Sequence, residues 1–357
     1  MRRSLIPILL LILAACSSGG QATTTTDVST TSTTAATTTT TAPVTTTTVA
    51  ATTTTLSPDG LVLPLATDTM PDTWREVFFI PYGDTPDTLG TSLGGDGGGV
   101  FWGPEYGAQA PDGSWWFLDT AKFRLAHFDS EGRYIEQVVI PTEMLVDGMY
   151  FQWSNPRVLD DGTVLASRYP GDTYFLRYRD GELDEFSVPV AAVPRIDDGD
   201  FLYALSFEDS SLWMIDPVAE TAERTEAMRA KDGRRFTAAV SPSTIHLELI
   251  DVALSQDLVF TSGGIAGGAY LSIEVATDHE GSLHLFILGF PEADESQQLA
   301  GYMKLSAEGQ VLLLEGMMDP SSASDPGTPA RLGVTPGTTN PTFMVIGTDG
   351  VRVYTRD

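Results

Sequence analysis

The side chains best suited to ligand recognition in this sequence are aromatic and arginine residues close to predicted inner strands. An aromatic ring offers a large apolar face, and arginine offers a planar set of hydrogen-bond donors. Together they suit carbohydrate or peptide recognition. The candidate binding residues are Trp102, Tyr106, Trp153, Asn155, Arg157 and Arg168. In the alternative interpretation, the tryptophans pack between sheets and have no ligand.

Two groups of acidic residues lie at predicted turns and could hold a metal ion. Asp197, Asp198 and Asp200 form the candidate metal site, and Asp278-His279-Glu280 is a similar group. Carboxylate oxygens suit Ca²⁺, which is the one cofactor that these residues suggest. Aspartate is also common in turns because its side chain accepts hydrogen bonds from nearby backbone N–H groups. A structural role therefore stays open for both groups.

One motif resembles a catalytic nucleophile, but its surroundings do not fit. Gly90-Thr91-Ser92-Leu93-Gly94 matches G-x-S-x-G, which functions on a sharp turn from a strand into a helix. The glycine-rich stretch that follows, Gly95–Gly99, cannot begin a helix, so Ser92 is interpreted as a loop residue. The sequence has no P-loop, dinucleotide fingerprint, zinc spacing or cysteine nucleophile. It predicts no catalytic residue and favours a binding protein over an enzyme.

The elements that must position the candidate residues are short strands. Residues 103–141 contain four apolar or alternating runs: Tyr106–Ala110, Ser114–Leu118, Arg124–Phe128 and Tyr134–Ile140. Asp-Gly and Glu-Gly pairs lie between them and are typical of hairpin turns, so four antiparallel strands are predicted. A sheet of this size is not stable alone and needs copies of itself to pack against.

Further copies follow along the chain. The second, Asn155–Val190, has turn glycines Gly162 and Gly181 at the same separation as Gly113 and Gly132 in the first. A third copy follows Asp198, a weak fourth covers about 234–268, and a clear fifth begins near Leu271. One helix is predicted over Glu220–Lys231.

The last copy holds only three strands, and its missing fourth strand indicates how the chain closes into a ring. An unpaired strand, Trp74–Tyr82, precedes the first complete copy and would complete the last one. This pairing closes a ring and leaves no open edge at the seam. The sequence therefore predicts an all-β fold, a β-propeller of six blades closed by an N-terminal strand. Five or seven blades stay open because the fourth copy is weak.

The first copy contains a pattern of turn glycines, aspartates, an arginine and a Phe-Asp pair: Gly107, Asp112-Gly113, Asp119-Thr120, Arg124, Phe128-Asp129 and Gly132. In this pattern it resembles the NHL repeat. NHL propellers serve as binding platforms and, in some relatives, as lyases or hydrolases, so the resemblance implies a fold and not an activity. Metal-dependent lactonases with six blades use asparagines with acids around the channel. This chain has two asparagines, Asn155 and Asn340, which argues against a lactonase and leaves other hydrolases open.

The N-terminus resembles the signal of a bacterial lipoprotein. Met1-Arg2-Arg3 is a positive region, Leu5–Leu13 is apolar, and Leu13-Ala14-Ala15-Cys16 resembles a lipobox. We expect residues 1–16 to be the signal peptide and Cys16 to be lipidated; the alternative is an ordinary secretory signal. Residues 17–56 are rich in threonine and predicted to be a disordered linker. Residues 57–357 are predicted to form the propeller.

Charge and export narrow the range of partners. The net charge is −28 and no basic run is present, so nucleic acid is not an expected partner. The sequence predicts a lipoprotein on the extracytoplasmic face of the cell membrane, attached through Cys16, that binds a glycan, peptide or protein. A metal-dependent hydrolase or lyase acting at the central channel is the alternative, and a purely structural spacer is a third.

Overall fold

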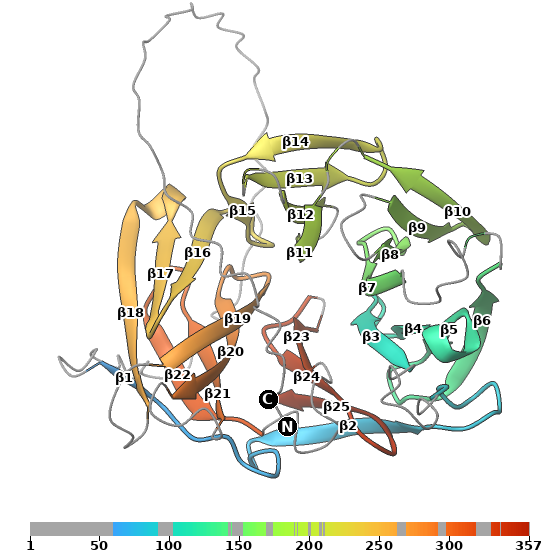
Figure 1. Cartoon of the computed structure of the whole chain (residues 1–357), viewed down its shortest axis with the longest axis horizontal. Coiled ribbons are helices and arrows are strands. Elements are labelled where there is room, and N and C mark those ends of the chain that lie inside the picture. Colours follow the sequence, from blue (N-terminus) through green and yellow to red (C-terminus); the bar gives the residue numbers. More distant parts are fainter. Residues whose placement is uncertain are drawn as a thin grey trace, which may run out of the picture.

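The computed structural model describes most of the chain from Gly60 to Arg356. The described residues are 60–91, 103–141, 144, 153–168, 174–188, 190, 192–198, 201–206, 209, 211–262, 269–291, 298–318, 330–335 and 337–356. Within them, the chain forms six β-sheets arranged as blades around a ring (Figure 1). The predicted six-bladed β-propeller is confirmed.

Neighbouring strands within each blade pair antiparallel, apart from the added strand β1. Blade one contains β3 (Pro104–Gln109), β4 (Trp115–Asp119), β5 (Arg124–Phe128) and β6 (Tyr134–Val139). Blade two contains β7 (Trp153–Val158), β8 (Val164–Arg168), β9 (Tyr174–Arg179) and β10 (Glu182–Ser187). Blade three contains β11 (Ala192–Asp198), β12 (Phe201–Ser206), β13 (Leu212–Asp216) and β14 (Thr221–Thr225).

The remaining blades contain the last strands of the chain and two N-terminal strands. Blade four contains β15 (Met228–Arg229), β16 (Arg235–Ser241), β17 (Thr244–Leu249), β18 (Leu254–Ser262) and β1 (Leu61–Leu63). Blade five contains β19 (Ala269–Thr277), β20 (Leu283–Pro291), β21 (Leu299–Leu305) and β22 (Val311–Gly316). Blade six contains β23 (Ala330–Val334), β24 (Pro341–Ile346), β25 (Gly350–Arg356) and β2 (Trp74–Pro81).

The predicted turns between the first two strands of a blade form through the same contacts in blades one and two. Gly113 and Gly162 have φ angles of 87° and 84°, which glycine adopts without strain. Asp112 Oδ1 accepts a hydrogen bond from Ser114 N, and Asp161 Oδ1 accepts one from Thr163 N, both at 2.9 Å. The repeat visible in the sequence is therefore a repeat of turn geometry.

The ring closes as predicted, through β2 and β25. These strands pair antiparallel from Trp74 opposite Arg356 to Pro81 opposite Gly350. In Figure 1, β2 lies along the edge of blade six beside the C-terminal strand. β2 thus completes the sheet made by the last three strands, and its pairing with β25 closes the ring.

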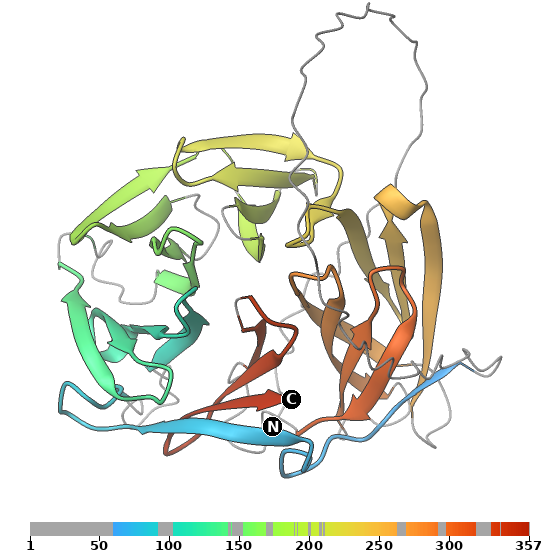
Figure 2. The same ribbon diagram turned by 180° about the vertical axis from the view of Figure 1, so that it is seen from behind.

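A second N-terminal strand, which the sequence did not predict, adds to blade four. β1 pairs parallel with β18, from Leu61 opposite Phe260 to Leu63 opposite Ser262. The chain then makes an isolated bridge from Leu65 to Leu299 of blade five before it reaches β2. Figure 2 shows this segment running past blades four and five to blade six. Residues 61–81 therefore connect three blades.

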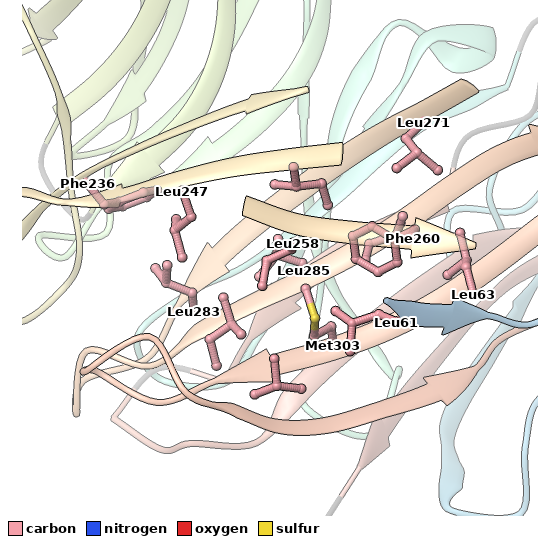
Figure 3. Packing of buried hydrophobic residues seen from close by; sticks show 14 of the residues in the cluster. Leu61, Leu63, Phe236, Leu247, Leu258, Phe260, Leu271, Leu283, Leu285 and Met303 are labelled. Carbon is pink, nitrogen blue, oxygen red and sulfur yellow. The ribbon is translucent and has the colours of Figure 1, made fainter. Parts of the chain in front are cut away.

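The core lies between the blades. Figure 3 shows part of the cluster between blades four and five, which includes Leu61, Leu63, Phe236, Leu247, Leu258, Phe260, Leu271, Leu283, Leu285 and Met303. Leu63 of β1 is fully buried in this cluster. Each blade thus gives one face of its sheet to each neighbour, as expected when small sheets stabilise one another.

The helix predicted over Glu220–Lys231 is wrong. Glu220 lies in a turn with a φ of 55°, β14 follows, and β15 begins at Met228. The apolar stripe of this stretch was thin, and pairing of β14 with β13 outweighs its local helix propensity. The described residues contain short 3₁₀ turns, such as Thr120–Lys122, and no α-helix. None of their helices has the length and apolar character needed to cross a membrane.

Candidate functional site

The structure describes one side chain among the six predicted binding residues. Arg157 lies in β7, the inner strand of blade two; it is 8% exposed, and its Nη1 donates to the Pro156 carbonyl at 3.1 Å. The backbones of Tyr106, Trp153, Asn155 and Arg168 lie in β3, β7, β7 and β8, but their side chains are outside the described part of the chain. Trp102 lies outside it altogether.

The residues of the predicted metal site are not described beyond their backbone. Asp197 and Asp198 end β11, while Asp200, together with Ser92 and the predicted lipidation site Cys16, lies outside the described residues. Among the residues that are described, no three His, Cys, Asp or Glu side chains come close enough to share a metal ion.

Asp278, in the second acidic group, has a structural role. Its Oδ1 accepts hydrogen bonds from Glu280 N at 3.0 Å and Ser282 N at 2.8 Å. Its Oδ2 lies 3.1 Å from His284 Nε2 and 3.4 Å from Lys304 Nζ. Both Asp278 and His284 are fully buried, and these contacts hold the pKa of Asp278 well below its usual range despite the burial. The side chain stabilises the turn between β19 and β20.

A carboxyl group that the sequence analysis did not select lies on the inner strand of blade five. Glu274, in β19, accepts a hydrogen bond through Oε2 from the backbone N–H of Leu332 in β23, at 2.9 Å. Burial raises the pKa of Glu274 to about 7, against the smaller opposing effects of the Leu332 hydrogen bond and the Arg157 charge. Blade two, which carries Arg157, stands across the ring from blade five (Figure 1).

Tyr270, Ser272 and Glu274 share one face of β19, because alternate residues of a strand point to the same side. On the next strand, Phe290 is directly opposite Tyr270, and Phe286 is opposite Glu274. The ring of Phe286 packs against Phe343 of blade six, with centroids 4.6 Å apart. This face of blade five is therefore turned toward blade six.

The part of this face near the start of β19 is open. Tyr270 is 48% exposed, Phe290 is 43% exposed, and Ser272 is also exposed. Among the described contacts, the hydroxyls of Tyr270 and Ser272 and Oε1 of Glu274 have no hydrogen-bond partner. Tyr270 and Glu274 are four residue steps apart along the strand, which is roughly 13 Å. We call Tyr270, Ser272, Glu274 and Phe290 the blade-five wall.

The blade-five wall combines an exposed aromatic pair with two hydroxyls and one carboxylate oxygen that have no partner among the described contacts, which is what a small ligand site requires. A signal for it was present in the sequence. The stretch Tyr270–Val275 alternates polar and apolar residues in a strand expected to be inner and buried, and the polar set forms the wall.

Residues 72–356 match the family model described as a domain of unknown function, DUF7485. The chain belongs to this family. A search of curated proteins found no match.

Several solved structures resemble the DUF7485 chain at low identity. A streptogramin B lyase is 10% identical over 71% of this chain and 93% of its own, with a TM-score of 0.43. A putative exported protein from Bacteroides fragilis is 11% identical over 83% and 98%, with a TM-score of 0.46. Regucalcin from Agrobacterium tumefaciens is 12% identical over 82% and 94%, with a TM-score of 0.39. These likenesses carry no argument about activity.

One arrangement in the DUF7485 propeller resembles a Ser-His-acid triad but is built to stabilise a turn. His127 Nε2 lies 2.8 Å from Ser114 Oγ, and His127 Nδ1 lies 3.4 Å from Glu136 Oε1. Ser114 Oγ, however, donates its proton to Asp112 Oδ1 at 2.6 Å, and Ser114 is only 5% exposed. A serine nucleophile must give its proton to the histidine and reach the substrate, so this group does not act as one.

Replacing Glu274 with glutamine should stabilise the DUF7485 propeller at alkaline pH. The folded-state pKa of Glu274, about 7, lies above its unfolded value, so the fold loses stability as the pH rises between these two values, and the loss is complete at alkaline pH. Wild type should therefore lose stability as the pH rises from 5 to 8.5, and Glu274→Gln should lose less because glutamine can still accept from Leu332 N. Thermal unfolding of both proteins at the two pH values measures this, and parallel pH profiles would contradict it.

Proposed function

We propose that this DUF7485 protein is a bacterial lipoprotein, held at the extracytoplasmic face of the membrane through Cys16, that binds an extracellular glycan, peptide or protein. The ligand enters at the mouth of the propeller channel and contacts the blade-five wall. One observation supports this proposal above the others: Tyr270 and Phe290 expose a pair of aromatic rings, and the hydroxyls of Tyr270 and Ser272 have no described partner. Paired aromatic rings with adjacent hydrogen-bonding groups are typical of recognition sites.

The sequence predictions support both the membrane attachment and the binding role in this proposal. The lipobox-like Leu13-Ala14-Ala15-Cys16 and the Thr-rich stretch that follows it suit an exported, tethered protein. The NHL-like pattern of blade one suits a binding platform. Arg157 and the candidate residues on β3 and β7 come from blades one and two, and would meet a ligand from the other side of the channel.

Replacing Tyr270 with alanine should weaken ligand binding by at least about tenfold, because a central aromatic contact is commonly worth 2 kcal/mol or more. The measurement uses full-length protein in detergent, first on glycan and peptide arrays and then by titration with the best ligand. Tyr174→Ala is the matched control, since Tyr174 is 42% exposed but lies on β9, outside the wall. Equal binding by wild type and Tyr270→Ala would refute the wall as the site.

Replacing Cys16 with alanine should release the protein from the membrane fraction, because the thiol is the proposed attachment point of the lipid. Fractionation of cells that produce each form, with labelling by a fatty-acid analogue, measures this. Wild type should carry the label and sediment with membranes, while Cys16→Ala should do neither. An unlabelled wild-type protein in the soluble fraction would refute the anchor and leave the binding site untouched.

A further inference from the structure

Glu274 is partly buried, and no cation among the described side chains forms an ion pair with it. Three other buried or partly buried carboxylates have cationic partners: Asp119 has Arg124 at 2.9 Å, Asp278 has Lys304 at 3.4 Å, and Glu315 has Arg356 at 2.8 Å. Glu274 instead accepts a hydrogen bond from the backbone N–H of Leu332. The charge of Arg157 lowers the pKa of Glu274, but no described ion pair joins the two side chains.

An unpaired, desolvated carboxylate favours a ligand that brings a positive charge. A hydrogen bond between an ammonium and a carboxylate is roughly twice as strong as one between neutral groups, so a charged amine gains more at Glu274 than a sugar hydroxyl would. A metal ion such as Ca²⁺ needs six or more oxygen ligands, and the wall supplies one carboxylate and two hydroxyls. The geometry thus favours an organic ammonium over a metal ion.

The length of the wall favours a ligand in an extended conformation. Tyr270, Ser272 and Glu274 repeat every two residues, roughly 7 Å, which is also the side-chain repeat of an extended peptide. The aromatic pair lies roughly 13 Å from Glu274, so one ligand must place its amine and its apolar group that far apart. The net charge of −28 would also favour the approach of a cationic ligand.

We infer that the blade-five wall binds an extended peptide that places a lysine or N-terminal ammonium on Oε1 of Glu274 and an apolar side chain against Tyr270 and Phe290. This inference rests on the proposed binding function and names its ligand class. No covalent step is involved.

Binding of this kind is linked to a proton. Glu274 must be ionised to hold an ammonium, and burial raises its pKa to about 7, so binding releases a proton in the range where Glu274 is partly protonated. Affinity should therefore rise with pH from 5.5 to 8. Among the described groups, Arg157 of blade two lowers the pKa of Glu274 through its charge, Phe286 of β20 lies opposite it, and the Leu332 N–H of β23 donates to it.

The test compares two peptides that differ in one charge. Acetyl-Lys-Gly-Gly-Gly-Phe amide places its lysine and its phenylalanine four residue steps apart, which is roughly the 13 Å that the wall requires. Its lysine amine stays protonated over this pH range, and the same peptide with its ε-amine acetylated has no such charge. Calorimetric titration of full-length protein should show at least about tenfold tighter binding of the charged peptide at pH 8, falling toward pH 5.5. Glu274→Gln should remove both the preference and the pH dependence. Glu280→Gln, a control at an exposed carboxyl in the following turn, should keep both.

Several outcomes would overturn the inference. Equal binding of the two peptides would do so, and so would a preference for the charged peptide that survives in Glu274→Gln. An equal loss of that preference in Glu280→Gln would assign the effect to the overall charge of the protein. If neither peptide binds but an array glycan does, and Tyr270→Ala abolishes that binding, the amine-bearing peptide is wrong and the binding function stands. If no array ligand binds and neither peptide does, both proposals fail.

Discussion

Replacing Trp74 with alanine should lower the free energy of unfolding by about 3–5 kcal/mol. Trp74 begins β2 and is 5% exposed. Its ring makes edge-to-face contacts with Tyr302 of blade five, at 5.2 Å between centroids, and with Phe343 of blade six, at 6.0 Å. One side chain therefore fills the space between the blades at the point where the ring closes.

The indole N–H adds a polar contact to this packing. Trp74 Nε1 donates to Glu315 Oε1 of blade five at 2.8 Å, and Arg356 of β25 donates to the same oxygen at 2.8 Å. Alanine would leave a cavity and remove one of the donors to a largely buried carboxylate. Both losses favour opening of the seam, since the strand that closes the ring would hold blade five less firmly.

Urea unfolding of the full chain measures the effect, and Arg75→Ala is the matched control. Arg75 is the next residue of the same strand and is exposed, so its removal should change the free energy of unfolding by about 0.5 kcal/mol or less. Equal effects of the two substitutions would mean that closure does not depend on the Trp74 side chain.

The closure and blade one were predictable because both leave local signals in the sequence. Turn residues such as Asp112-Gly113 mark where strands end. An unpaired strand at Trp74 implies that another sheet of the chain lacks one strand. Neither inference needs the position of a distant side chain. This is why the strand order within blade one and the closure followed from local signals, whereas five and seven blades stayed open until the structure showed six.

The remaining features depend on long-range contacts that the sequence does not show. β1 is three residues long, and its partner β18 lies about two hundred positions away in the chain. The stretch after Glu220 has residues that tolerate a helix, and its pairing with β13 decides its structure. Glu274 looks like an ordinary polar strand residue until β23 is placed beside it. The hydrogen bond of Glu274 was not predictable for the same reason, because its donor comes from another blade.

Replacing Arg124 with methionine should lower the free energy of unfolding by about 3–5 kcal/mol, because it breaks a buried ion pair. Arg124 is 2% exposed and Asp119 is fully buried; Arg124 Nε donates to Asp119 Oδ2 at 2.9 Å. Burial raises the pKa of Asp119, and the charge and hydrogen bond of Arg124 oppose this effect. Without Arg124, Asp119 would be desolvated with its main partner missing.

The same arginine holds the chain between β2 and blade one. Its guanidinium donates to the carbonyls of Pro86, at 2.9 Å, and Thr88. Lys122 Nζ donates to the carbonyls of Thr85 and Thr88, both at 2.8 Å. Arg124→Met should therefore also make residues 85–90 more susceptible to limited proteolysis, and a protease digest followed by mass spectrometry locates the cut.

Two further variants separate the buried pair from charge in general. Arg133→Met removes an exposed partner of Asp129, and water screens that pair, so it should change stability little. The double variant Asp119→Leu with Arg124→Met should be more stable than Arg124→Met alone, because no buried charge then lacks a partner. If the double variant were as unstable as the single one, the loss would come from the contacts to Pro86 and Thr88. Arg124 would then stabilise the propeller mainly by fixing the chain that joins the closing strand to blade one.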